Sequence, residues 1–223
     1  MSDLQEQRNF VYNILCSEKP LDEQIALYSE IAETYDQMCD DTLYHYPEIL
    51  SQELETFNLC RDSKILDVGA GTGRLGKLLH SLKYTNIDAL DGCEKMLQQA
   101  RNLPDVYRSF TQALVIADNE LPIPEKKYDV ALMCGSGGPA HIDVTAYKQL
   151  IRVVKSGGLI GWIIDDPEIR VKISSRFHDN FYEKTLQKFV NEQLWVAVDG
   201  YNPKRVPNAA VANPGDVFFY KVL

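Results

Sequence analysis

The sequence predicts an α/β fold in which a mostly parallel sheet carries helices on both faces. Across residues 64–165, short apolar segments alternate with segments whose apolar residues recur at helical spacing. This alternation is typical of βαβ units with parallel strands. The first apolar segment, 65–68, runs directly into a glycine-rich turn. Near the C-terminus, segments 194–199 and 216–222 have no crossover helix between them, which predicts an antiparallel pair.

Size and composition indicate one globular domain. The chain has 223 residues, of which 45% are hydrophobic and 25% charged, an ordinary composition for a protein with a substantial core. We expect an N-terminal helical cap over 1–58 and a core over 59–223, together forming one structural domain. The net charge of −9 argues against a nucleic-acid partner, which needs a basic face.

Apolar runs and cysteines in the sequence indicate the cellular location and whether a metal site is expected. The sequence has neither an apolar run long enough to cross a membrane nor, over residues 1–8, the apolar stretch of a secretory signal. Its five cysteines are scattered and contain no C-x-x-C pair. These features predict a cytoplasmic protein with reduced thiols and no metal site.

The N-terminal segment predicts two helices. Apolar and aromatic residues recur at helical spacing over 24–39. Pro47 can stand in the first turn of a second helix that carries Leu50 and Leu54.

The core elements follow in order. Five strands are expected at 65–68, 86–91, 108–114, 128–134 and 159–165. A leucine stripe from Leu75 to Leu82 predicts the first helix, and 94–101 the second. The third helix is expected to end at the glycines of 155–158. A last helix is expected at about 177–192.

The glycine-rich turn is the most informative motif. Gly69, Gly71 and Gly73 alternate directly after the first strand, so the backbone can adopt positive φ and a ligand can approach it closely. Dinucleotide-binding proteins and S-adenosyl-L-methionine (SAM) dependent methyltransferases both use such a turn. Asp67 favours the second family, because its charge would repel a pyrophosphate but suits the α-amino group of SAM or an ordered water.

Asp91 is the candidate ribose ligand. It ends the second strand, where a carboxylate can accept hydrogen bonds from both hydroxyls of a ribose. Its separation from Asp67 also fits NAD, and an aspartate capping the following helix is the structural alternative. Gly92, Cys93 and Met96 would then lie beside the ribose and adenine.

Two further loops are expected at the same edge of the sheet. Residues 117–122 resemble an acidic loop that reads the adenine amino group, which makes Asp118 a candidate; residues 112–114 are a competing location. Cys134 and Gly135 follow the fourth strand, where the backbone can contact the methionine part of the cofactor.

Taken together, these motifs resemble class I SAM-dependent methyltransferases over residues 25–223. The motifs are 67–73, Asp91 and 153–159. The segments 28–36, 90–97 and 214–220 are similar to the family of the methyltransferase-like protein encoded in the Williams–Beuren syndrome region. The resemblance implies a Rossmann-like, seven-stranded, mostly parallel sheet with an antiparallel C-terminal strand, SAM as cofactor and S-adenosyl-L-homocysteine as product. The expected cofactor contacts are Tyr35, Asp67, Gly69, Ala70, Gly71, Gly73, Asp91, Gly92, Cys93, Met96, Asp118, Cys134 and Gly135.

The expected reaction is in-line methyl transfer to an oxygen or nitrogen nucleophile of a small molecule. His141 is the best candidate for a base among the four histidines, and a histidine that orders its loop is the alternative interpretation. Tyr28, Tyr44 and His45 are candidates for substrate contacts from an N-terminal lid. We expect a monomer or homodimer without nucleic-acid or membrane partners. The alternatives are an NAD(P)-dependent oxidoreductase and a non-catalytic SAM-binding partner protein.

Overall fold

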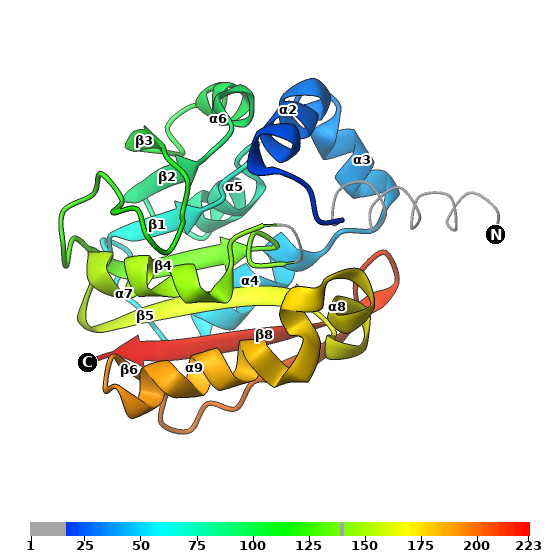
Figure 1. The fold of residues 1–223 in the computed structure, drawn as a ribbon. Helices are drawn as coiled ribbons and strands as arrows, with labels where there is room; N and C mark the ends of the chain where they lie inside the picture. Colours follow the sequence, from blue (N-terminus) through cyan, green and yellow to red (C-terminus); the bar gives the residue numbers. More distant parts are fainter. Residues whose placement is uncertain (1–16, 139–140) are drawn as a thin grey trace.

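An eight-stranded sheet forms the centre of the protein (Figure 1). The computed structural model describes residues 17–138 and 141–223. Five strands run parallel in the order β3-β2-β1-β4-β5, and the C-terminal strand β8 pairs antiparallel with β5, β6 and β7. The strands are β1 Ile65–Val68, β2 Ile87–Asp91, β3 Ser109–Gln112, β4 Tyr128–Cys134, β5 Val154–Asp165, β6 Trp195–Ala197, β7 Lys204–Ala210 and β8 Asn213–Val222.

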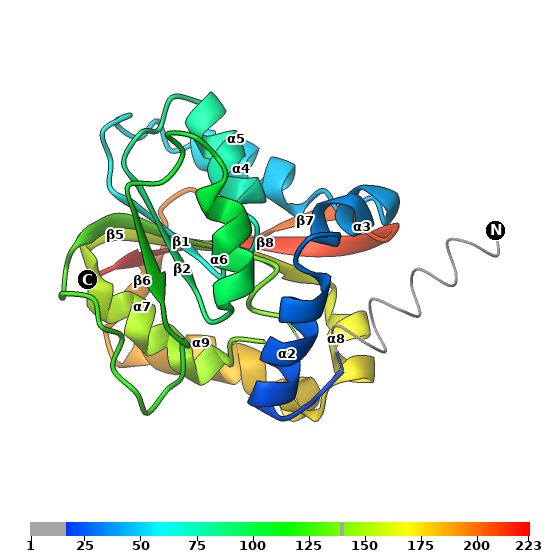
Figure 2. The same ribbon diagram turned by 90° about the horizontal axis from the view of Figure 1, so that it is seen from above.

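Helices cover both faces of this sheet (Figures 1 and 2). They are α2 Leu21–Ile31, α3 Tyr35–Asp41, α4 Tyr46–Glu55, α5 Arg74–Ser81, α6 Glu94–Arg101, α7 Tyr147–Val153, α8 Pro167–Ile173 and α9 Phe181–Asn191, with short 3₁₀ segments at Val144–Ala146 and Ser175–Asn180. Helices α4 and α5 pack in one layer, whereas α7 and α9 pack on the opposite face. Helices α2 and α3 lie across the end of the sheet where the parallel strands finish, and α2 contacts α6.

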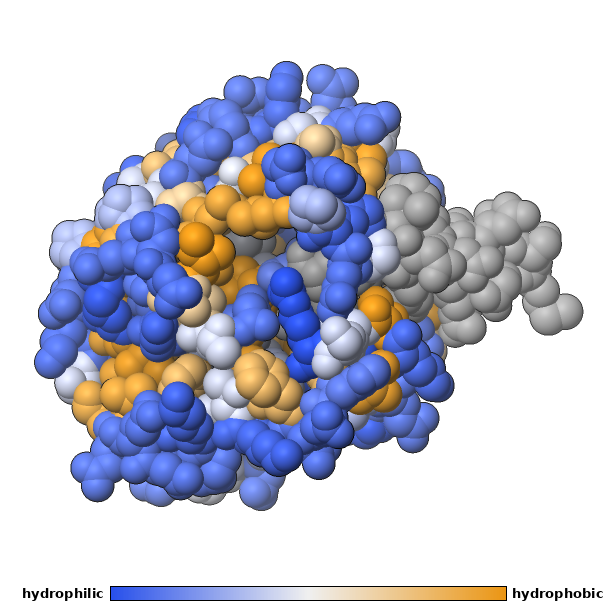
Figure 3. Space-filling model, in the orientation of Figure 1, coloured by the Kyte–Doolittle hydropathy of each residue, from blue (hydrophilic) through white to orange (hydrophobic). Residues whose placement is uncertain are grey.

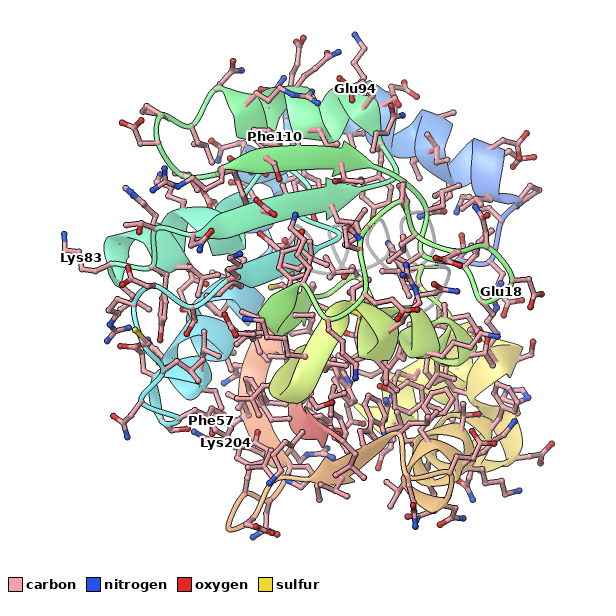
Figure 4. The ribbon with its side chains drawn as sticks, turned by 90° about the vertical axis from the view of Figure 1, so that its left-hand side faces the viewer. Glu18, Phe57, Lys83, Glu94, Phe110 and Lys204 are labelled. Carbon is pink, nitrogen blue, oxygen red and sulfur yellow. The ribbon has the colours of Figure 1, made fainter. Side chains whose placement is uncertain are left out.

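The core is divided by the sheet into two apolar clusters. Ile160, Trp162 and Ile164 of β5 point into one cluster, and Leu159 and Ile163 into the other, as the alternation of a strand requires. Figure 4 shows the edge of the sheet, where Phe110 of β3 lies beneath α6. The fold therefore holds the carboxyl ends of the parallel strands in a fixed row.

The sheet has one strand more than expected. Residues 204–210 form β7, although they include Pro207 and Asn208, two residue types that strands disfavour. They become a strand because β8 supplies hydrogen-bonding partners at Lys204, Arg205 and Val206. The antiparallel arrangement of β6 and β8 agrees with the sequence prediction.

Several element boundaries also differ from the expectations. The helix predicted over 24–39 is two helices, α2 and α3, separated at residues 32–34. The strand β5 begins at Val154, so the glycines expected to end the preceding helix lie within the strand, where Gly157 has φ +83° and the pairing with β4 changes register. Strand β3 is shorter than predicted.

The C-terminal helix likewise starts later than expected. Helix α9 begins at Phe181 because Asp179 and Asn180 adopt left-handed backbone conformations, and α8 was not anticipated. The N-cap residue of α8, Asp166, accepts a hydrogen bond from the backbone N–H of Glu168, and Pro167 stands in the first turn of α8; both are usual signals of a helix start.

The N-terminal helices lie in two different places. Leu50 and Leu54 of α4 pack into the sheet core, whereas α2 and α3 lie over the edge of the sheet. Residues 1–16 lie outside the described residues. They include part of the expected cap and residues 1–8, for which the sequence predicts no secretory signal. Over 17–138 and 141–223, no helix is long and apolar enough to cross a membrane.

Candidate active site

A cavity of about 230 Å³ lies at the carboxyl ends of the parallel strands. The loops after β1, β2, β3 and β4 form its wall, the end of β5 and residues 210–211 add to it, and α2 and α3 cover it. Figure 3 shows apolar residues around the hollow in the middle of this face. Ligands of open parallel sheets bind at this edge.

The glycine-rich turn is pressed against the loop that follows β4. Gly69, Gly71 and Gly73 all have positive φ. A Cβ at Gly69 would lie 2.3 Å from Cβ of Ser136, so only glycine fits there. The Ser136 hydroxyl donates to the carbonyl of Val68 at 2.7 Å, which fixes the two loops together. Gly69 and Gly71 line the cavity, whereas Ala70 and Gly73 belong to the same turn but do not line it.

Asp91 connects the ends of β1 and β2. Its Oδ2 accepts the N–H of Gly71 at 2.8 Å, and its Oδ1 accepts the N–H of Cys93 at 2.7 Å. Burial raises the pKa of this carboxyl, and the backbone hydrogen bonds oppose the increase. Because each carboxylate oxygen has more than one lone pair, Asp91 can still accept hydrogen bonds from a ligand in the cavity that it lines.

Asp67 lies behind the turn and not on the cavity wall. Its side chain is buried, with 1% of the residue exposed, and its Oδ2 accepts the hydroxyl of Tyr107 at 2.7 Å. Within the described chain Oδ1 has no hydrogen-bond partner. Burial raises the pKa of this carboxyl to about 7, although the hydrogen bond from Tyr107 opposes the increase. The structure therefore separates Asp67 from the cavity through which it was expected to act.

Tyr107 is a partner of Asp67 that the sequence did not reveal. Its hydroxyl lies where a Cβ at Gly76 would stand, only 2.1 Å from that position. A glycine inside helix α5 was the available signal, because such a glycine weakens a helix unless another group needs the space.

The adenine end of the expected site lies against the segment after β3. Residues 113–116 line the cavity together with Gly92, Cys93 and Met96. Asp118 does not line it, so the structure brings the competing location to the cavity and leaves the acidic loop aside. The neighbouring position, Gly92, has Leu114 within 2.5 Å of an added Cβ, which shows how closely the two loops pack.

Tyrosines from the covering helices reach the cavity at the end of β4. Tyr28 Oη and Nε2 of His141 are 2.6 Å apart, and both residues line the cavity. Tyr44 donates to the carbonyl of Cys134 at 3.3 Å, and Tyr35 lies beside Tyr28. Burial raises the pKa of both Tyr35 and Tyr44 well above its usual value.

His45 does not line the cavity. Its backbone N–H donates to the carbonyl of Ala209 at 2.8 Å, which joins the start of α4 to β7. The preceding residues Pro139 and Ala140 of the His141 loop lie outside the described residues.

Two polar groups fix α3 over the glycine turn. The Thr72 hydroxyl donates to Asp36 at 2.5 Å, and Arg74 pairs with Asp40 at 2.7 Å. These contacts join the covering helix directly to the start of α5. In the described part of the chain, no group of three or more His, Cys, Asp or Glu side chains could hold a metal ion.

Asp165 is a site residue that the sequence did not single out. It ends β5, lines the cavity and is 8% exposed. Tyr46 donates its hydroxyl to Oδ1 of this carboxylate at 2.9 Å. Its position as the last residue of a predicted strand was the available signal.

Comparisons with known proteins agree with this geometry. Residues 65–158 match the family model described as a methyltransferase domain. Methyltransferase-like protein 27 of Homo sapiens is 27% identical over 179 residues, which cover 78% of this chain and 69% of the human protein.

Solved structures share the fold. The 1,6-didemethyltoxoflavin-N1-methyltransferase of Burkholderia thailandensis, with bound 1,6-didemethyltoxoflavin and S-adenosylhomocysteine, matches with a TM-score of 0.58 at 17% identity over 92% of this chain and 90% of that one. A SAM-dependent methyltransferase of Aquifex aeolicus matches with a TM-score of 0.53 at 18% identity over 79% of this chain and 89% of that one.

Proposed function

The chain is a class I SAM-dependent methyltransferase, and we propose that it transfers the methyl group to an oxygen or nitrogen nucleophile of a small molecule. The observation that carries the proposal is the covered cavity, which has the glycine turn and Asp91 at one end and tyrosines and His141 at the other. The methyltransferase match decides against the alternative of an NAD(P)-dependent oxidoreductase.

The residues at the glycine end suit the cofactor. Gly69 and Gly71 present backbone without side chains, and Asp91 offers carboxylate lone pairs beside an apolar slot that contains Met96 and residues 113–116. When bound, the cofactor would supply a methyl group from a positively charged sulfur. The sulfur would keep the electron pair of its bond to the methyl carbon, as the acceptor's lone pair forms the new bond. The protein's part is alignment and exclusion of water.

The acceptor's proton must leave when it is methylated, and we assign this role to His141. Its Nε2 lies at the cavity wall within hydrogen-bond distance of the Tyr28 hydroxyl. A neutral imidazole can take a proton near neutral pH, and a hydroxyl neighbour can orient the ring. Both groups come from elements that also form the cavity, α2 and the loop after β4.

The size and charge of the site favour a small acceptor. A cavity of about 230 Å³ under two helices accommodates a small molecule beside the cofactor more readily than part of a folded macromolecule. The net charge of −9 supports the absence of a nucleic-acid partner. The neighbour from Burkholderia thailandensis, which holds a small heterocycle, is consistent with this choice. A cytoplasmic location is part of the proposal, because four cysteines in the described residues are free thiols.

Two measurements test the proposal. Calorimetry with SAM, S-adenosylhomocysteine and NAD should show binding of the first two ligands only. Incubation with isotope-labelled SAM and fractionated small metabolites should then transfer label into the low-mass fraction. Label found only in protein or nucleic acid would contradict the small-molecule acceptor, and binding without any transfer would favour a non-catalytic SAM-binding protein.

A further inference from the structure

A buried carboxylate, Asp165, lies on the cavity wall beyond the residues expected to hold the cofactor. Its Oδ1 accepts the Tyr46 hydroxyl, and a Cβ at Gly138 would lie 3.7 Å from its Oδ2. The carboxylate is therefore placed between the start of α4 and the loop after β4. With 8% of the residue exposed, it is largely shielded from bulk water.

The strand order sets its distance from the cofactor end. Strands β2, β1, β4 and β5 are neighbours, so Asp91, Gly69, Cys134 and Asp165 form a row along one edge of the sheet. Neighbouring strands lie about 4.8 Å apart, which separates Asp165 from the glycine turn by about 10 Å. The strand-end residues expected at the cofactor all lie on β1, β2 and β4. Asp165 therefore lies on the side that is left for the acceptor.

The charges of the wall are one-sided. Its described residues include two carboxylates, Asp91 and Asp165, and neither lysine nor arginine. An anionic acceptor would bring a second negative charge close to a buried carboxylate, where desolvation and repulsion both oppose it. A cation is favoured in the same place.

Aromatic rings add to this preference. Tyr28, Tyr35 and Tyr44 line the cavity, and the face of a tyrosine ring attracts a cation that lies over it. We propose, on the basis that the chain is a small-molecule methyltransferase, that its acceptor is a small organic amine, cationic at neutral pH, and that Asp165 is the specificity-determining residue that binds the amine. The amine binds as the ammonium ion and gives up one proton, which His141 takes, before the nitrogen lone pair attacks the methyl group.

The test uses compounds that share a ring and differ in the polar group it carries, which is cationic, neutral or anionic. Benzylamine, benzyl alcohol and benzoate, with their cyclohexyl counterparts, are titrated into the full chain saturated with S-adenosylhomocysteine, and binding is followed by ligand-observed NMR. The amines should bind at least about tenfold more tightly than the alcohols, as expected for a hydrogen bond to a charged group. The carboxylates should bind most weakly. Equal binding of amines and alcohols, preference for the carboxylates, or no amine binding overturns the inference.

Variants assign the preference to Asp165. Asp165→Asn keeps an oxygen that can accept the Tyr46 hydroxyl but removes the charge, and should weaken amine binding by about tenfold or more while alcohol binding stays the same. Tyr46→Phe keeps the carboxylate and should retain the preference for amines. Asp88→Asn is the matched control, because Asp88 is also 8% exposed but pairs with Lys127 and Tyr128 away from the cavity. It should leave the preference unchanged.

The affinity for S-adenosylhomocysteine separates this inference from the proposed function. It should change less than about twofold in Asp165→Asn, because a neutral side chain at this position removes no cofactor contact. If the parent chain does not bind S-adenosylhomocysteine, the proposed function fails. If the parent binds it but Asp165→Asn loses this binding, Asp165 holds the cofactor and the inference about the acceptor fails alone.

Discussion

Replacing Asp91 with alanine should weaken cofactor binding more than it weakens the fold. In the proposed site this carboxylate accepts hydrogen bonds from the ribose hydroxyls, and each hydrogen bond to a charged group contributes about 1.5 to 3 kcal/mol. Two such bonds amount to at least about 3 kcal/mol, or roughly a 100-fold increase in Kd. Calorimetry with S-adenosylhomocysteine measures this change directly.

The structure also predicts a cost in stability for the same variant. The N–H groups of Gly71 and Cys93 lose their acceptor, and an unsatisfied buried donor costs about 1 to 3 kcal/mol. Because Gly71 and Cys93 line the cavity, water can replace part of this interaction, so we expect a total loss of about 1 to 3 kcal/mol in the free energy of unfolding. Thermal or urea unfolding of the cofactor-free protein measures it.

Two control variants sharpen the result. Asp91→Asn retains an oxygen acceptor for one backbone N–H and should lose less stability than Asp91→Ala while still binding the cofactor weakly. Asp118→Ala removes an acid that does not line the cavity and should leave the Kd within about twofold. An unchanged Kd in Asp91→Ala would refute the ribose assignment, and a large loss in Asp118→Ala would return the adenine contact to the acidic loop.

Three further predictions follow from the same geometry. Burial raises the folded-state pKa of Asp67 to about 7, above the unfolded value of 3.8, so between these values the folded protein holds a proton that the unfolded chain releases. The contribution of Asp67 to the free energy of unfolding should therefore fall as pH rises from about 4 to 7. Asp67→Asn should flatten this slope in urea unfolding. A persistent slope in the variant would assign it to another group. If α2 and α3 act as a lid, hydrogen exchange over residues 24–46 should slow with S-adenosylhomocysteine, whereas equal protection would indicate a permanently closed cover. If His141 accepts the proton, His141→Ala should lower kcat and abolish the acidic limb of its pH profile, while Tyr28→Phe should retain the limb with a shifted midpoint; loss of cofactor binding in either variant would place the pair at the cofactor.

Much of the cofactor end could be predicted because its signals are local. The alternating glycines follow a short apolar strand, and each strand after it ends on a recognisable residue such as Asp91 or Cys134. Parallel strands bring their carboxyl ends to one edge, so a correct strand assignment already places these residues together. Asp67 and Asp118 do not line the cavity, because position along the chain does not determine the direction of a side chain.

The residues at the acceptor end of the cavity were harder to predict from the sequence, for a physical reason. Tyr46 and Asp165 are far apart in sequence, and their hydrogen bond forms only because α4 packs across the sheet beside the end of β5. Tyr107 reaches Asp67 only because Gly76 leaves room for its hydroxyl within α5. Such contacts depend on how elements pack, which periodicity and spacing do not encode.

By itself, the sequence determined the α/β fold, the parallel direction of the early strands and the glycine turn with Asp91, because hydrophobic period and backbone freedom are properties of short segments. The tertiary structure alone decided that 204–210 is a strand, that Asp67 is buried behind the turn and that Asp165 faces the cavity. Each of these depends on a partner distant in sequence: β8 for the strand, Tyr107 for Asp67 and Tyr46 for Asp165. Such partners are set only when the layers of the fold close on one another.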